Sequence, residues 1–130
     1  MQVIFCRNNR PLSFLIRAFT FSRWSHCGVV IDDHVIHATA LNGVVIQPLI
    51  EVKQDYPSHE VCQLPGNAEL ALPLVGRKYD WGGVFGVRWG GWGDPDKWFC
   101  SELVAYCTCL FRENRVSRVT PEHCYMLSRS

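Results

Sequence analysis

Several short stretches of the chain are rich in apolar and β-branched residues. Short runs of this kind, bounded by turn residues, are typical of strands. The pattern predicts strands at residues 2–6, 25–31, 34–39, 44–48 and 58–63. The pairs Asp32-Asp33 and Asn42-Gly43 separate consecutive strands and are favourable turn residues. The sequence therefore predicts a mostly antiparallel sheet in which neighbouring strands form hairpins.

Other segments follow the helical period of 3.6 residues. Pro11 suits a first helical position, and the apolar residues after it keep helical spacing (Leu12, Leu15, Ile16 and Phe19). Residues 67–75 also have a helical pattern. The strongest helix is expected at 97–112, after the capping segment Asp94-Pro95-Asp96, and a short one is expected from Thr120-Pro121-Glu122. Strands and helices together predict an α+β fold, with residues 1–130 forming a single domain.

Composition and charge narrow the class of protein. Apolar residues make up 48% of the chain and charged residues 19%, which supports a hydrophobic core and argues against a disordered chain. The formal net charge is only +1, so nucleic-acid binding is not expected. The apolar runs are too short for a transmembrane segment. The residues after Met1 do not resemble a signal peptide, which predicts synthesis in the cytoplasm.

The seven cysteines are expected to be reduced thiols, most of them buried. A shared metal ion is not expected. Cys107 and Cys109 lie two positions apart in a helical pattern, so their side chains point in different directions. His34 and His37 lie an odd number of positions apart in a strand, so their side chains point to opposite faces. No metal and no cofactor is predicted.

The hairpin at 25–39 brings two histidines together. A two- or four-residue loop centred on Asp32-Asp33 places His37 opposite Gly28 and therefore diagonal to His26 on the same face. The missing side chain of Gly28 leaves space beside both imidazole rings. A three-residue loop would place the rings on opposite faces. The alternative is that both histidines are ordinary half-buried residues.

Cys100 is expected in the first turn of the 97–112 helix, where unpaired N–H groups favour a thiolate. Lowering a thiol pKa from about 8.5 to about 5 takes roughly 4.8 kcal/mol, and a helix end supplies at most about 2 kcal/mol. An imidazolium nearby must supply the remainder. The alternative is that Cys100 only begins the apolar stripe of the helix.

Four segments together resemble the NlpC-like papain-fold cysteine peptidases. Residues 76–83 and 99–104 resemble the nucleophile segment of that superfamily, G-x-x-Y-x-W-G-G and F-x-C-S-x-L-V. Residues 25–30 and 35–38 resemble its histidine hairpin. Both histidines precede the cysteine here, as in the circularly permuted branch that includes YiiX-like bacterial proteins and the lecithin:retinol acyltransferase group. Cys27 and Glu102 depart from the family pattern, which usually has an aliphatic residue and glycine at these positions.

The resemblance implies a permuted papain-like (NlpC-type) fold, with an antiparallel sheet packed against helices and the nucleophile at a helix N-terminus. It assigns Cys100 as the nucleophile, His26 as the base, His37 as the residue that orients the base, and Tyr79 as a tyrosine lining the pocket. The reaction it implies is acyl transfer through a thioester, without a cofactor.

The function expected is that of a cysteine amidase or peptidase acting on peptidoglycan-type peptides, carried by a phage or exported by a non-Sec route. The expected partner is a peptide or another small acyl-containing substrate. A lipid-directed thiol acyltransferase or esterase is one alternative, and a catalytically inactive module that binds peptide or glycan is another. The segment from Trp81 to Trp98, rich in glycine and tryptophan, is expected to form one wall of the substrate cleft.

Overall fold

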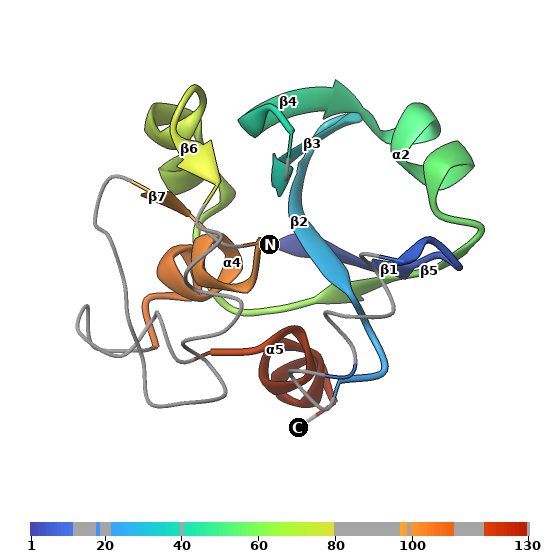
Figure 1. Ribbon diagram of the computed structural model, residues 1–130. Helices are drawn as coiled ribbons and strands as arrows, with labels where there is room; N and C mark the ends of the chain where they lie inside the picture. The colour runs from blue at the N-terminus through green and yellow to red at the C-terminus, as the bar shows by residue number, and fades with distance from the viewer. Residues whose placement is uncertain are drawn as a thin grey trace.

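A five-stranded antiparallel sheet forms the centre of the protein (Figure 1). The computed structural model describes residues 1–11, 18, 22–39, 41–79, 97–98, 100–110 and 119–129, with the side chains of residues 79, 97 and 98 left out. The sheet has the order β4-β3-β2-β1-β5. Its strands are β1 (Gln2–Arg7), β2 (His26–Ile31), β3 (His34–Thr39), β4 (Gly43–Pro48) and β5 (Ser58–Gln63). The α+β class and the antiparallel sheet predicted from the sequence are confirmed.

Two connections in this sheet are tight hairpins, and the other pairings join distant parts of the chain. Strands β2, β3 and β4 follow one another as a meander, with Asp32-Asp33 forming the first turn. Asp32 adopts a positive φ of 51°, which aspartate tolerates better than most residues. Strand β1 lies between β2 and β5, so the first strand of the chain is inside the sheet. The β2–β3–β4 meander is the part of the sheet that carries both histidines.

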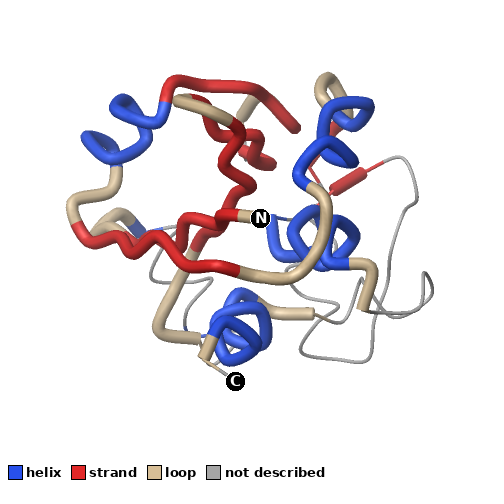
Figure 2. Tube along the Cα trace, turned by 180° about the vertical axis from the view of Figure 1, so that it is seen from behind, coloured by secondary structure: helices blue, strands red, loops and turns tan. Residues whose placement is uncertain are grey.

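Helices cover both faces of the sheet. Helix α2 (Leu49–Asp55) lies on one face, where Val52 packs with Ile4, Cys6, Val30 and Val35. Helices α4 (Cys100–Thr108) and α5 (Pro121–Ser128) lie on the other face, with the 3₁₀ helix η1 (Ala68–Leu74) beside α4 (Figures 1 and 2). The larger core is on this second face, where Val3, Phe5, Cys27, Val29 and Ile36 pack with Leu103 and Val104. The sheet is thus the middle layer between a short helix and a larger helical layer.

Several segments differ from their sequence-based predictions. The sequence did not predict helix α2, and residues 68–74 form a 3₁₀ helix in which Pro73 removes a backbone donor. The prediction of one helix over 97–112 was wrong at both ends. Residues 97–98 form strand β7 (Lys97–Trp98), which pairs in parallel with β6 (Lys78–Tyr79), and residues 109–110 are not helical. Helix α4 begins at Cys100 and ends at Thr108, and Cys109 follows with a φ of 58°. The final helix predicted from Thr120 is confirmed as α5.

Other predictions fall mostly outside the described residues. These are the apolar positions of the helix predicted after Pro11, the capping segment at 94–96 and the substrate wall predicted from Trp81 to Trp98, of which the structure describes only the backbone of residues 97–98.

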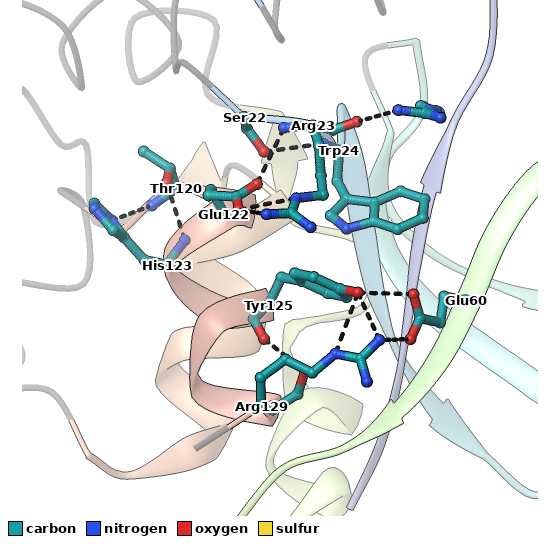
Figure 3. Close-up of polar contacts among 11 residues, drawn as sticks. Ser22, Arg23, Trp24, Glu60, Thr120, Glu122, His123, Tyr125 and Arg129 are labelled. Carbon is teal, nitrogen blue, oxygen red and sulfur yellow. Dashed lines mark hydrogen bonds and ion pairs between the residues drawn. The ribbon is translucent and has the colours of Figure 1, made fainter.

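Helix α5 is joined to the sheet by polar contacts around Tyr125 (Figure 3). The Tyr125 hydroxyl donates to Glu60 Oε2 on β5 at 2.9 Å, and Arg129 pairs with the same carboxylate. At the other end, the backbone N–H and Nε of Arg23 both donate to the Glu122 carboxylate. Arg23 lies just before β2, so these contacts fix the chain as it enters the strand that carries His26.

Among the described residues, none of the helices has the length and apolar character that crossing a membrane requires.

Candidate active site

His26 and His37 lie side by side on one face of the β2–β3 hairpin. The two strands pair Ile31 with His34 and Val29 with Ile36, which is the register of a two-residue turn. His26 Nε2 lies 2.7 Å from His37 Nδ1, and both side chains are buried. The prediction that this hairpin brings the two rings together on one face is confirmed.

Gly28 makes the space for this pair. A Cβ atom at position 28 would lie 2.9 Å from His37 Cβ and 2.6 Å from Val35 Cγ1, closer than side-chain atoms normally approach. The close approach agrees with the prediction that Gly28 stands opposite His37. The absence of a side chain at position 28 is therefore a requirement of the histidine pair.

Gly28→Ala is expected to destabilise the protein by about 1–3 kcal/mol, because the new methyl group must displace Val35 or His37. It should also slow the reaction of Cys100 with iodoacetamide. Urea unfolding and peptide mass spectrometry measure the two effects. The control is Gly76→Ala, whose methyl group would meet no atom within 4 Å although the φ of 96° costs some stability. Unchanged stability and reactivity in Gly28→Ala would show that the close approach is unimportant.

His37 is neutral in the folded protein. Burial, and after it the charge of His26, lower the pKa of His37 from its ordinary value of 6.5 to about 3. The other ring nitrogen, Nε2, lies 3.0 Å from Gln47 Oε1 on β4. The lowered pKa therefore makes His37 a neutral hydrogen-bond partner of His26.

An aromatic ring covers His26 on the side of helix α2. Tyr56, just after this helix, stacks on His26 with a centroid separation of 5.3 Å and an interplanar angle of 10°. The stacking limits rotation of the imidazole and keeps water from its face. Sequence reasoning missed Tyr56, because nothing in its local pattern indicates a contact with a strand so far away in the chain.

Cys100 is the first residue of α4, and its sulfur lies at the beginning of β2. The Sγ atom is 4.0 Å from the carbonyl oxygen of Ser25, the residue that precedes the strand. His26 and Cys27 are consecutive residues whose side chains point to opposite faces of the sheet. Hydrogen bonding of both side chains to the sulfur is among the causes that lower the pKa of Cys100. His26 Nε2 lies 2.7 Å from His37, so Nδ1 is the ring nitrogen that remains for a contact with the sulfur.

The electrostatics of Cys100 differ from those of the other buried cysteines. Burial raises its pKa, but hydrogen bonds from the Cys27 thiol and from His26, the charge of His26 and the backbone N–H of Cys27 together bring the pKa well below its ordinary value of 9.0. Burial raises the pKa of Cys6 and Cys124, and that of Cys107 to about 12. Burial and hydrogen bonding to Cys100 also raise the pKa of Cys27. The structure thus favours a thiolate at Cys100 and a thiol at Cys27.

Of the predicted site residues, Cys100, His26 and His37 come together. The structure describes only the backbone of Tyr79, in β6, so its predicted place in the pocket is outside the description. Sequence reasoning noted Cys27 only as a departure from a motif, and it missed Gln47. Within the described part of the chain, no group of three or more His, Cys, Asp or Glu side chains is arranged to hold a metal ion.

A buried thiolate beside a histidine pair can act as a nucleophile toward carbonyl carbon, with His26 as the proton donor and acceptor. Comparison with known proteins adds no assignment to this geometry: no family model and no curated protein sequence matches the chain.

Proposed function

We propose that the protein is a thiol-dependent hydrolase of the permuted papain-like (NlpC-type) fold, which cleaves amide bonds in peptidoglycan-type peptides. The observation that carries the proposal is the connected set Cys100, His26 and His37. The Cys100 thiol at a helix start has a pKa that hydrogen bonding with His26 and the charge of His26 help to lower, and His26 Nε2 lies 2.7 Å from Nδ1 of His37. Such a set is what nucleophilic catalysis by cysteine requires.

In the proposed mechanism the Cys100 thiolate attacks the carbonyl carbon of the substrate amide. The backbone N–H of Cys100, at the start of α4, is the oxyanion donor that we favour. When the C–N bond breaks, the His26 imidazolium gives its proton to the leaving amine, and a thioester remains on Cys100. His26, now neutral, accepts a proton from water as that water attacks the thioester. The carboxylic acid leaves, and the thiolate–imidazolium pair is restored.

His37 holds the charged form of His26 in place by accepting a hydrogen bond at Nδ1. Because His37 is itself neutral, it does not compete with His26 for the proton. The arrangement corresponds to the base and orienting residue of a cysteine hydrolase.

Incubation with purified muropeptides, followed by mass spectrometry, tests the proposal. We expect the wild-type protein to convert a muropeptide into two fragments that together contain one added water, and Cys100→Ala to leave it intact. Cys109→Ala is the matched control, because Cys109 is exposed at the other end of the same helix. A parallel incubation with lipid extracts separates the alternative, since release or transfer of a fatty acyl group there would support a lipid-directed acyltransferase or esterase. Turnover of neither substrate class would contradict the proposed hydrolase.

A further inference from the structure

A third polar side chain continues the line of the two histidines across the sheet. Strand β4 pairs with β3 so that Val45 is opposite His37 and Gln47 is opposite Val35. Gln47 therefore lies diagonal to His37 on the same face, just as His26 does from the other side. His37 Nε2 is 3.0 Å from Gln47 Oε1, so His26, His37 and Gln47 form one hydrogen-bonded row over three strands.

The far end of this row fixes the direction of its hydrogen bonds. Gln47 Nε2 donates to Glu51 Oε2, in the first turn of α2, at 3.3 Å. An ionised carboxylate only accepts hydrogen bonds, so the amide nitrogen of Gln47 must face Glu51 and its carbonyl oxygen must face His37. That oxygen is also only an acceptor, and His37 Nε2 must therefore carry the hydrogen.

The remaining nitrogen of His37 then has a lone pair. A neutral imidazole has one N–H, so His37 Nδ1 can only accept, and it accepts from His26 Nε2–H at 2.7 Å. With His26 in the charged form, its second hydrogen is on Nδ1, the nitrogen left for Cys100. A His37 ring in the other tautomer would instead direct an N–H toward the N–H of His26 and disfavour the imidazolium.

We propose that Gln47 is a positioning residue that fixes the tautomer of His37, and that Glu51 fixes the orientation of the Gln47 amide. The inference rests on the proposed function for its consequence in catalysis, but the tautomer itself is a property of the folded chain. Gln47 is half-buried and Glu51 is exposed, so the row runs from the buried thiol to the surface of the molecule.

The first test replaces the amide by an apolar side chain of similar length. In Gln47→Met, the reaction of Cys100 with iodoacetamide should require a higher pH, because the thiolate–imidazolium pair is less stable, and the rate at about pH 6 should fall roughly tenfold. All variants carry Cys109→Ser to remove the exposed thiol. The matched control is Gln54→Met, an exposed glutamine of α2, which should react as the wild type does.

The second test exchanges the two side chains. In the double variant Gln47→Glu, Glu51→Gln, the new carboxylate accepts from His37 and also from the new amide, so the rate at about pH 6 should recover. The single variant Glu51→Ala should lose part of the wild-type rate of iodoacetamide reaction at about pH 6. A merely structural role for Gln47 would lower stability without moving the pH profile and without rescue by the exchange.

Nitrogen-15 NMR of the histidine rings reads the tautomer directly, without any substrate. We expect His37 to be the Nε2–H tautomer in the wild type and a mixture in Gln47→Met. An Nδ1–H tautomer in the wild type, or identical spectra and pH profiles for Gln47→Met and Gln54→Met, would overturn the inference. The proposed function fails by a different result, namely the absence of turnover in the wild type whatever the tautomer of His37.

Discussion

Replacing His26 with alanine is expected to lower kcat/KM about a thousandfold and to remove the reactivity of Cys100 at about pH 6. Hydrogen bonding to His26 and the charge of this residue are among the causes that bring the pKa of Cys100 below its ordinary value. Without them, burial raises the pKa of Cys100 and only the hydrogen bonds from Cys27 remain to oppose it, so less of the sulfur is thiolate. Steady-state kinetics on the muropeptide substrate and iodoacetamide labelling measure the two losses.

His34→Ala is the matched control, since His34 is an exposed histidine on the same strand as His37. It should leave both activity and labelling unchanged. Circular dichroism establishes whether each variant is folded. A folded His26→Ala protein that still labels rapidly at Cys100 would show that the thiolate does not depend on His26.

Acid is expected to destabilise the folded protein through His37. The pKa of this ring is lowered by burial and by the charge of His26 to about 3, whereas in the unfolded chain it has its ordinary value of 6.5. Between these values the unfolded state binds the extra proton, so the contribution to stability is complete above about pH 6.5 and is lost as the pH falls toward 3. Over the first two pH units of that fall, the loss amounts to about 2 kcal/mol.

Urea unfolding at about pH 7.5 and pH 4.5, with the cysteines reduced, gives the free energy of unfolding at each pH. His37→Gln keeps an acceptor for His26 but does not titrate, so it should lose less stability than the wild type between the two conditions. His34→Gln should behave as the wild type does. Equal losses in the wild type and His37→Gln would mean that His37 is not held neutral by the fold.

The sheet could be predicted from the sequence because its strands are short runs of apolar and β-branched residues bounded by turn residues. A loop of two or four residues centred on Asp32-Asp33 gives the register of the hairpin and the contact between His26 and His37, and the structure has the two-residue turn. The turn residues alone left a three-residue loop open. Helix α2 could not be derived in this way. It has only seven residues and follows Pro48, and within it only Leu49 and Val52 pack on the sheet, which is too few positions to establish a helical period.

The parts of the site that sequence reasoning missed depend on contacts between distant segments. Gln47 contacts His37 only because of the register between β3 and β4. Tyr56 contacts His26 because the chain after α2 passes over β2. The start of α4 was predicted three residues too early because the β6–β7 pairing of Lys97–Trp98 has no signal in local propensity. The correct start makes Cys100 the first residue of the helix.

The order of the strands has a consequence for how the protein folds. His26, His37 and Gln47 all belong to the β2–β3–β4 meander, whose contacts are between residues close in sequence. Cys100 meets Ser25 across 75 residues, and β1 meets β5 across a comparably long loop. Closing long loops costs more chain entropy than closing short ones, so topology favours formation of the meander before these distant contacts. A chain emerging during synthesis therefore contains His26, His37 and Gln47 well before it contains Cys100, and the sulfur joins the histidines only after helix α4 has been added.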